Sequence, residues 1–402
     1  MLFRGQSGDS LFTLSLQPHW ITLGVDETFI VSWDRGGRLY SVYRHGHTFR
    51  RGLNGRILEK WQDADGWRRW DTLDQADAEA LVDDGARLAA RVRDAIGSPH
   101  WSWVGEPPGT TSGELDAALG RTIAFTGTAS RRDAARFAEI YSPVGILPPD
   151  QYLSVVVQAT EGCSFNTCTF CDLYGGHFRV KPAGEFEAHL RAVRDFLGVS
   201  LGLRGRSIFV GSANALAVPM ARLAPMFEAI GRVFPDARGG TAAFLDGFTG
   251  VHKSAADFGA LRDLGLQRVY IGLETGHDPL LSFVRKPATR AQVVDTVRAV
   301  KEGGVHVGII VMIGLGGETF AQAHVTDTIA ALNDMPLDGD DLLYFSDLVE
   351  QPGTPYPALA SERAIGPLSA ERRAEQRRTI REGLRTTSPP RVATYDVREF
   401  VY

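Results

Sequence analysis

The sequence has 402 residues, a formal net charge of −5 and a hydrophobic content of 44%. This length allows one large domain with a smaller one attached, and the slightly acidic balance argues against nucleic acid as a partner. No apolar run approaches the roughly 20 residues that a membrane span needs, and the N-terminus lacks a signal-peptide pattern, so we expect a cytoplasmic protein without a membrane span.

The first 97 residues have the pattern of a small α+β domain. Short β-branched and aromatic runs at 12–16, 20–23, 29–33 and 39–43 are separated by polar and glycine residues, which is typical of an antiparallel meander. Apolar residues at helical spacing follow and predict a helix that ends near Gly97. We therefore predict an N-terminal α+β domain with antiparallel strands over residues 1–97.

Residues 98–150 are predicted to be a linker and a helix that lead to the core. The stretch 98–113 contains turn-forming residues that include Pro99, Pro107, Pro108 and Gly109, which favour a linker or an ordered surface loop. Trp101 and Trp103 in this stretch either cover a pocket or pack against the neighbouring domain. Residues 131–140 have the composition of a helix.

From residue 151 to about residue 356 the pattern alternates between buried strands and amphipathic helices. Apolar strands are expected near 155, 208–210, 242–245, 269–271, 307–313 and 342–345, and apolar residues recur at helical spacing over 186–197 and 293–300. Six such units predict a parallel sheet covered by helices. A doubly wound sheet and a partial barrel both fit this alternation. Residues 357–402 are expected to form a C-terminal helix and tail.

The three cysteines of the chain, Cys163, Cys168 and Cys171, lie within nine residues directly after the first buried strand. A disulfide would leave one thiol over, and a zinc site would need a fourth ligand such as His177. A [4Fe–4S] cluster held by three thiolates would leave one iron open to a ligand. The spacing by itself therefore allows an iron–sulfur cluster, zinc or buried thiols.

The turns that follow the other predicted strands carry small, acidic and hydroxyl-bearing residues. Ligands of parallel α/β proteins bind at the carboxyl ends of the strands, so these residues are candidates for one site. They are Gly211, Ser212, Asn214, Asp246, Glu274, Thr275, Gly314, Asp347 and Glu350. Each turn alone has a structural alternative, which is a tight turn for Gly314 and helix N-capping for the aspartates.

The cysteine loop, with Phe170 just before its last cysteine, and the order of these turns resemble the partial barrel of radical S-adenosylmethionine (SAM) enzymes. The resemblance covers about residues 152–356, roughly half of the chain. The commonest spacing in that family is Cys-x3-Cys-x2-Cys, whereas this loop has Cys-x4-Cys-x2-Cys. The resemblance implies an α/β fold with a partial (β/α)6 TIM-like barrel over residues 151–356, an N-terminal α+β domain and a short C-terminal extension over residues 357–402.

The resemblance also implies the cofactors and their contacts. Cys163, Cys168 and Cys171 would hold a [4Fe–4S] cluster, and SAM would bind its open iron. The SAM contacts would be Phe170 near the adenine, Gly211 and Ser212 at the methionine amino group, Glu274 and Thr275 at the ribose and carboxylate, and Ile313 and Gly314 beside the adenine. The family has an acidic residue next to the position of Ser212, and here Asn214 would replace it as an acceptor.

In activity, the resemblance implies reductive cleavage of SAM to a 5′-deoxyadenosyl radical, which abstracts hydrogen from a small or medium-sized metabolite. An external one-electron donor such as flavodoxin or ferredoxin would reduce the cluster. Because no further cysteine exists in the sequence, a cysteine cannot donate the closing hydrogen atom. Either a tyrosine such as Tyr174 supplies it, or SAM is regenerated, or the product radical is oxidised or eliminated. Asp246, Asp347 and Glu350 are the candidate general bases or contacts for a polar or cationic substrate.

Two alternatives to a metabolite enzyme stay open at this point. The first is a radical SAM enzyme that modifies RNA or a protein, and the acidic balance of the chain argues against the RNA version. The second is a binding module that holds zinc or a cluster without SAM. The strand-end turns in family order favour the enzyme over this module.

Overall fold

The computed structural model describes residues 1–107, 109, 112–250, 252–351 and 353–402. The chain divides into two compact units, and each contains segments that are far apart in the sequence. Unit 1 comprises Met1–Tyr141, Ala192–Gly205 and Glu399–Tyr402, and unit 2 comprises Ser142–Arg191 and Arg206–Arg398. The N-terminal unit therefore extends beyond the predicted boundary at residue 97. Pro108 of the predicted linker lies outside the described residues.

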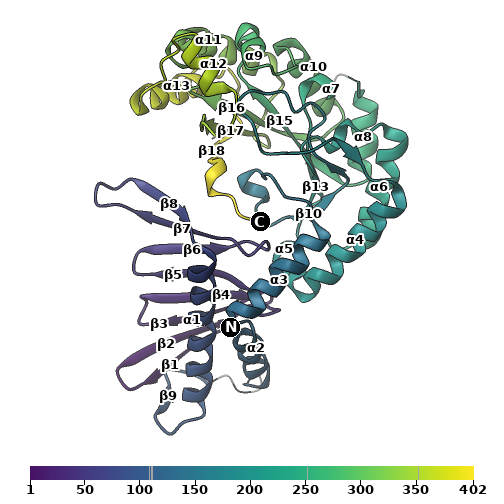
Figure 1. The fold of residues 1–402 in the computed structure, drawn as a ribbon. Helices are drawn as coiled ribbons and strands as arrows, with labels where there is room; N and C mark the ends of the chain where they lie inside the picture. The colour runs from purple at the N-terminus through teal and green to yellow at the C-terminus, as the bar shows by residue number, and fades with distance from the viewer. Residues whose placement is uncertain (108, 110–111, 251, 352) are drawn as a thin grey trace. The chain divides into compact units, whose positions relative to one another are not determined.

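The described part of unit 1 contains a nine-stranded antiparallel sheet in the order β8-β7-β6-β5-β4-β3-β2-β1-β9 (Figure 1). The strands are β1 (Leu2–Ser7), β2 (Ser10–Leu16), β3 (Trp20–Val25), β4 (Phe29–Asp34), β5 (Leu39–Arg44), β6 (His47–Arg51), β7 (Ile57–Gln62), β8 (Arg68–Thr72) and β9 (Trp101–Trp103). The predicted antiparallel meander is thus present, and it is larger than the four runs indicated.

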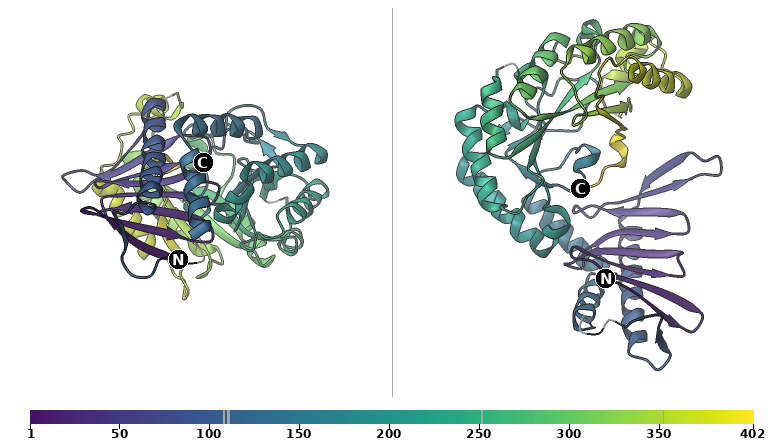
Figure 2. Two further views of the ribbon diagram at one scale, coloured as in Figure 1. Left: turned by 90° about the horizontal axis from the view of Figure 1, so that it is seen from below. Right: turned by 180° about the vertical axis from the view of Figure 1, so that it is seen from behind.

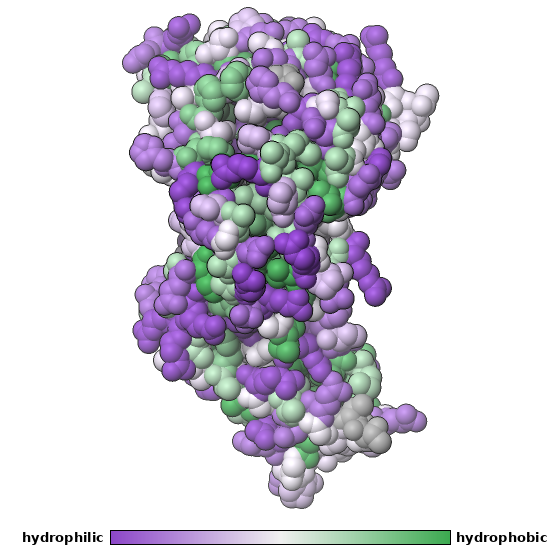
Figure 3. Space-filling model, turned by 90° about the vertical axis from the view of Figure 1, so that its right-hand side faces the viewer, coloured by the Kyte–Doolittle hydropathy of each residue, from purple (hydrophilic) through white to green (hydrophobic). Residues whose placement is uncertain are grey.

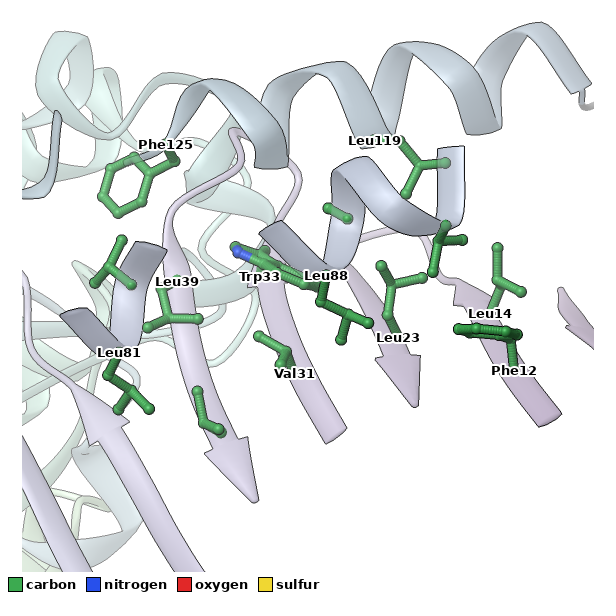
Figure 4. Packing of buried hydrophobic residues seen from close by; sticks show 14 of the residues in the cluster. Phe12, Leu14, Leu23, Val31, Trp33, Leu39, Leu81, Leu88, Leu119 and Phe125 are labelled. Atoms are coloured by element: carbon green, nitrogen blue, oxygen red, sulfur yellow. The ribbon is translucent and has the colours of Figure 1, made fainter. Parts of the chain in front are cut away.

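One face of this sheet is covered by helices α1 (Gln75–Ile96) and α2 (Ser112–Ala124). Strand residues such as Leu14, Leu23 and Trp33 alternate inward and pack against Leu88 and Leu119 of the helices (Figure 4). The alternation follows from the two-residue period of a strand. Helix α1 begins where the Asp74 carboxylate accepts a hydrogen bond from the Asp77 N–H, and it ends at Gly97 as predicted.

The two tryptophans of the predicted linker belong to the core of unit 1. Trp101 and Trp103 lie in β9, which pairs with β1, and their rings lie 5.2 Å apart. The Trp101 ring also lies 5.5 Å from the Phe12 ring. Of the two suggested roles, the structure shows packing against a neighbouring domain, and that domain is the N-terminal α+β domain.

Polar and aromatic contacts explain why distant segments join unit 1. Arg38 donates hydrogen bonds to the Phe196 carbonyl at 2.7 Å and to Ser200 Oγ at 2.8 Å. It also pairs with Asp133 of helix α3 (Gly127–Ile140) at 2.8 Å. At the C-terminus, the Tyr402 carbonyl accepts a hydrogen bond from the Asn54 N–H at 2.9 Å. The residue pairs that hold this unit together are therefore separated by up to hundreds of positions in the sequence.

Unit 2 is built on a parallel sheet in the order β10-β13-β14-β15-β16-β17-β18. Its strands are β10 (Val155–Gln158), β13 (Ile208–Gly211), β14 (Thr241–Phe244), β15 (Leu266–Glu274), β16 (His306–Ile313), β17 (Leu342–Asp347) and β18 (Arg391–Thr394). The first six are the predicted strands. The seventh lies in the stretch that we expected to be only a helix and tail.

The strand order distinguishes the two architectures that the sequence left open. Each strand pairs with the next one in the chain, and right-handed crossovers with an unreversed order place the helices on one face of the sheet. A doubly wound sheet would require a reversal of order. Among the described strands β10 does not pair with β18, so the barrel is partial, with the helices outside and the strands curved within (Figures 1 and 2).

The helices of unit 2 follow the strands in the predicted alternation. They are α4 (Ala183–Leu197), whose last residues are grouped with unit 1, α6 (Met220–Val233), α7 (Gly247–Gly250), α8 (Ala255–Asp263), α9 (Asp278–Phe283), α10 (Arg290–Glu302), α11 (Gly317–Asp334), α12 (Tyr356–Glu362) and α13 (Ala370–Glu382).

The end of the barrel at which the strands begin is held together by tyrosines. The hydroxyls of Tyr270 and Tyr344 donate to the two carboxylate oxygens of Asp150, at 2.5 and 2.7 Å. Tyr270 fits inside the barrel because Gly308 on the next strand has no side chain, and a Cβ there would lie 2.4 Å from the Tyr270 ring. The interior is therefore filled by aromatic rings at this end.

The surface of the molecule has the mixed character expected from a charged content of 23%. Figure 3 shows one face on which small groups of hydrophobic residues are interspersed with hydrophilic ones. Among the residues that the structure describes, no helix has the length and apolar content needed to cross a membrane.

Candidate active site

The cysteine loop leaves the end of strand β10 and is closed at its neck by a short antiparallel ladder. Strands β11 (Thr160–Glu161) and β12 (Arg179–Val180) pair there. The Glu161 carboxylate binds Arg179 at 2.9 Å and Lys181 at 3.0 Å, and these cations lower the pKa of Glu161 against the opposing effect of burial. The two ends of the loop are thus held together by backbone pairing and by ion pairs.

Contacts from the next parts of the barrel fix the middle of the loop. The Thr169 N–H donates to the Val284 carbonyl at 3.0 Å, and the Thr169 carbonyl accepts from the Tyr356 N–H at 2.9 Å. Thr169 itself is fully buried. The two residues that flank it, Cys168 and Phe170, are therefore placed by the end of helix α9 and the start of helix α12 as well as by their own strand.

The three cysteines line one cavity of about 200 Å³, together with Asn214, Asp246, Glu274 and Lys286. Phe170 and Tyr174 of the loop also line it. These residues come from the loop after β10, from the ends of β13, β14 and β15 and, for Lys286, from the segment after helix α9. The carboxyl ends of the parallel strands thus converge as expected. The cavity lies entirely within unit 2.

Glu274 and Lys286 form a buried ion pair in the wall of this cavity. The Lys286 Nζ lies 3.0 Å from Glu274 Oε1, and each side chain is 11% exposed. Glu274 has a φ of +58°, a backbone conformation that costs a non-glycine residue free energy. Gly272, two residues earlier, makes room for the pair, because a Cβ there would lie 2.2 Å from Glu274 Oε1.

Asn214 and Asp246 form a second polar pair. The Asn214 amide donates to the Asp246 carboxylate and, at 2.9 Å, to Ser164 Oγ of the cysteine loop, and the Asp246 N–H donates back to Asn214 Oδ1 at 3.1 Å. Asp246 Oδ1 accepts from the Thr249 N–H at 2.6 Å. Asp246 therefore caps the start of helix α7 and also lines the cavity.

Burial controls the protonation of the thiols and of their neighbouring cation. It raises the pKa of Cys171 to about 11, and it raises the pKa of Cys168, with the Lys286 ammonium opposing part of that rise. Burial by itself would lower the pKa of Lys286, but the charges of Glu274 and Cys168 outweigh it and raise that pKa. The thiols of Cys168 and Cys171 are thus protonated until a metal displaces their protons, and Lys286 stays charged.

Several predicted site residues lie outside this cavity. Gly211 and Ser212 line a second cavity of about 10 Å³ that shares Ile146 and Tyr174 with the first, and the Ser212 N–H donates to Thr160 Oγ1. Thr275, Ile313, Gly314, Asp347 and Glu350 are not among the described residues that line either one.

Each of these other residues has a structural environment of its own. Thr275 is fully buried and its hydroxyl bonds to His324 Nδ1 at 2.8 Å. Gly314 adopts a φ of +83° and its N–H donates to Gln376, which is the tight turn weighed as its alternative. Asp347 is paired with Arg377, Ile313 is buried within β16, and Glu350 is exposed.

Other residues line the cavity without having been singled out from the sequence. Lys286 follows helix α9 rather than a strand, so a search of the turns that follow predicted strands does not include it. Tyr270 and Met312 lie inside predicted strands, where the sequence does not show which face points inward. Tyr395 follows the seventh strand, which lies in the stretch that we expected to be only a helix and tail.

Comparison with known proteins supports the family assignment. The family model described as the radical SAM superfamily matches residues 157–329, which contain the cysteine loop and strands β13 to β16. A search of curated proteins found no significant match to the sequence.

Solved structures with low similarity include several radical enzymes. Elp3 of Methanocaldococcus infernus with an N-terminal deletion shares 12% identity at a TM-score of 0.40, over 60% of this chain and 56% of that one. The coproporphyrinogen III oxidase HemN of Escherichia coli shares 14% identity at a TM-score of 0.41, over 60% of this chain and 53% of that one. The FeFe-hydrogenase maturase HydG of Carboxydothermus hydrogenoformans shares 11% identity at a TM-score of 0.37, over 80% of this chain and 77% of that one. The chain thus spans little more than half the length of the first two.

Residues 157–329 form a radical SAM domain, and this domain supports radical SAM enzyme activity. Its cofactors are a [4Fe–4S] cluster and SAM. The residues present fit these groups, because three thiols face one cavity and a fourth cysteine does not exist in the sequence. A buried carboxylate and a buried ammonium lie beside them, and they are complementary to the charged amino and carboxylate groups of SAM.

Proposed function

We propose that this enzyme abstracts hydrogen from a small or medium-sized metabolite bound in the cysteine-lined cavity. The observation that carries the proposal is the convergence of all three cysteines and the Glu274–Lys286 pair on one cavity of about 200 Å³. Pockets that bind small molecules typically have volumes of about 300–1,000 Å³. At about 200 Å³ this cavity lies below that range even before the cofactors are bound, so it favours a small ligand over a segment of RNA or protein.

The bound cofactors would supply reductive cleavage of SAM to a 5′-deoxyadenosyl radical that takes a hydrogen atom from the substrate. Cys163, Cys168 and Cys171 would hold the cluster as thiolates. Lys286 and Glu274 would bind the charged end of SAM by charge-assisted hydrogen bonds, and Phe170 would pack beside it. Asn214 would contribute a polar contact through its position between Ser164 and Asp246.

Asp246 and Tyr174 are the candidate catalytic residues that line the cavity. The Asp246 carboxylate is held by Asn214 and by the start of helix α7, so it could accept a proton or orient a substrate hydroxyl without moving. The Tyr174 hydroxyl donates to the Ile146 carbonyl at 3.4 Å. Asp347 and Glu350 have no part in this proposal, since the first is paired with Arg377 and the second is exposed.

The proposal includes an external one-electron donor of the flavodoxin or ferredoxin class, which would reduce the cluster. It also places the enzyme in the cytoplasm, because three unpaired thiols that hold an iron–sulfur cluster suit a reducing compartment.

Anaerobic reconstitution with iron and sulfide, followed by dithionite and SAM, tests the proposal. We expect four irons per chain after desalting and the release of 5′-deoxyadenosine and methionine, quantified by liquid chromatography. Cys163→Ala should abolish both products. Thr167→Ala, which removes an exposed side chain of the same loop, serves as the matched control and should keep them.

A chain that takes up one zinc and no iron, and that leaves SAM intact, would contradict the proposal in favour of a zinc-binding module. Screening extracts of small metabolites for one that raises 5′-deoxyadenosine release would then identify the substrate.

A further inference from the structure

The cavity that the three cysteines line is rich in groups that carry negative charge. Asp246 and Glu274 line it together with the thiols, and Lys286 is the one cation among the described residues that do so. Cysteines that bind a metal do so as thiolates. Three thiolates and two carboxylates then face a single ammonium, in a wall where burial weakens the screening by water.

Two hydrogen bonds place the segment that carries Lys286 beside Cys168. Their donors flank the cysteine in the sequence, and their acceptors are the carbonyls of the two residues directly before the lysine. The bonds run from the Thr169 N–H to Val284 at 3.0 Å and from Thr167 Oγ1 to Arg285 at 3.2 Å. The lysine and the cysteine are therefore held next to each other by contacts of the backbone.

Lys286 is fixed at both ends of its side chain. Its backbone N–H donates to the carbonyl of Leu281 in helix α9 at 2.9 Å. Its Nζ lies 3.0 Å from Glu274 Oε1, and the side chains of this pair are each 11% exposed. The ammonium therefore keeps its place in the cavity wall and does not extend into solvent.

The charge of Lys286 acts on the neighbouring sulfur. Burial raises the pKa of Cys168, the Lys286 ammonium opposes this rise, and the charges of Glu274 and Asp246 add to it. The three charged side chains of the wall thus influence the cysteine with the signs that their charges require.

The same charges bear on the redox property of a cluster at this position. One-electron reduction adds a negative charge to a cluster, so a nearby ammonium stabilises the reduced form more than the oxidised form, and a carboxylate does the reverse. Net charge is one of the factors that set the reduction potential of an iron–sulfur cluster. In a wall with one cation, the loss of that cation should be felt strongly.

We propose that Lys286 raises the reduction potential of the cluster and so makes the cluster easier for a one-electron donor to reduce. The inference rests on the proposed function, because it takes the cluster to be held by the three cysteines. Lys286 has this role through its charge and before SAM is bound, in addition to its proposed contact with SAM.

Substitution of each member of the ion pair by glutamine tests the inference. Anaerobic titration of the reconstituted, SAM-free protein with titanium(III) citrate and redox mediators, followed by the cluster absorbance, gives the midpoint potential of each variant. At a fixed potential we expect Lys286→Gln to lower the ratio of reduced to oxidised cluster about tenfold, which corresponds to about 59 mV toward more negative potential. Glu274→Gln should raise this ratio by a similar factor, because it removes a charge of the opposite sign.

The two substitutions separate an effect of charge from an effect of structure. Both break the same ion pair, so loosened packing would move both potentials in one direction. Arg285→Gln is the matched control, since it removes a positive charge one residue away from an exposed side chain that is not among the described lining residues. Screening by water should keep its ratio within about twofold of the parent.

Shifts of the same sign for Lys286→Gln and Glu274→Gln would overturn the inference. So would a Lys286→Gln potential equal to that of the parent, or an equally large shift for Arg285→Gln. If Lys286→Gln assembles no cluster, Glu274→Gln carries the test alone, and a potential that does not rise overturns the inference.

The outcome is separable from that of the proposed function. A parent protein that assembles no cluster would overturn the proposed function and the inference together. A parent protein that assembles the cluster and cleaves SAM, with potentials that ignore Lys286 and Glu274, would overturn the inference alone.

Discussion

Gly272 shows how the absence of one side chain prepares the site. The position is occupied by the ends of Glu274 and Lys286, with distances of 2.2 and 3.2 Å from a Cβ placed there. Both are far ends of flexible side chains, so an added methyl group would displace the ion pair rather than the backbone. Stability and function should therefore respond differently to this substitution.

We predict that Gly272→Ala weakens SAM binding about tenfold, the effect of losing one charge-assisted hydrogen bond, while the free energy of unfolding falls by less than about 1 kcal/mol. Equilibrium dialysis and denaturant titration measure the two. Gly175→Ala in the cysteine loop is the control, since a Cβ there would meet nothing within 4 Å. Equal SAM affinities for the two variants would contradict the proposal that the Glu274–Lys286 pair binds SAM.

His324 gives the stability of unit 2 a dependence on pH. The side chain is fully buried in helix α11, and burial, with a contribution from the charge of His277, lowers its pKa to about 4. The unfolded chain binds this proton near the ordinary pKa of about 6.5. The stabilisation is therefore complete above pH 6.5 and is lost as the pH falls toward 4.

We predict that His324→Gln removes part of the acid sensitivity. The parent protein should lose roughly 3 kcal/mol more than the variant between pH 7 and pH 4, which follows from the size of the shift. Urea unfolding at a series of pH values measures the difference. His252→Gln, at an exposed histidine, should behave as the parent does. Parallel pH profiles for parent and His324→Gln would show that His324 is protonated in the folded protein.

At the scale of elements, the ladder of β11 and β12 decides the shape of the cysteine loop. Gly162 lies next to Cys163 with a φ of +69°, and a Cβ there would lie 2.9 Å from the His177 carbonyl oxygen across the neck of the loop. Gly176 has a similar φ of +86°, but a Cβ there would meet nothing within 4 Å. The two glycines therefore separate backbone strain from steric contact.

We expect Gly162→Ala to lose its cluster about fivefold faster than Gly176→Ala under chelator, a rate difference that corresponds to roughly 1 kcal/mol. Both variants carry the cost of a left-handed alanine, and only the first must also move the neck of the loop. Decay of the cluster absorbance in the presence of a chelator gives both rates. The role of the neck is refuted if the two decay rates agree.

The strand β18 is the element that the sequence did not reveal. Arg391–Thr394 is four residues long and mostly exposed, so it has neither the apolar run nor the alternation by which strands are recognised. Its pairing with β17 supplies the structure instead. The six other strands carry apolar runs because helices and barrel interior bury both their faces, and this is why the sequence showed them.

At the scale of the whole molecule, the last four residues belong to unit 1 rather than to the barrel that precedes them. Tyr402 is 1% exposed, and its ring lies 6.1 Å from Phe137 and 6.0 Å from Tyr141. The seven tryptophans of the chain all lie within residues 20–103, and so in unit 1, whereas the three cysteines lie in unit 2. Tryptophan fluorescence and cluster absorbance therefore report on different units.

We predict that deleting Glu399–Tyr402 lowers the stability of unit 1 by about 3–5 kcal/mol, the usual cost of losing a large buried aromatic side chain. The thermal transition followed by tryptophan fluorescence should shift down, while the iron content after reconstitution stays that of the parent. Val199→Ala in the same unit is the control, because Val199 is 66% exposed. An unchanged fluorescence transition would contradict the assignment of the C-terminus to unit 1.

The sequence alone determined the elements that depend on local pattern. The clustering of Cys163, Cys168 and Cys171, the six apolar strands and the order of the strand-end turns were all visible in it, because spacing along the chain encodes them. The resemblance they carry to radical SAM enzymes is confirmed by the family match. A partial barrel was one of two architectures that this pattern allowed, and strand order decided between them.

Only the tertiary structure decided which side chains meet. Asp347 stands at a strand end as the sequence showed, yet Arg377 of helix α13 pairs with it. Lys286 and Tyr395 follow no predicted strand and nevertheless line the cavity. The physical reason is that a side chain reaches a site by the direction in which its element packs, and packing depends on residues that are distant in the sequence. The cysteine loop in the sequence indicates the type of chemistry, and the fold determines which residues surround it.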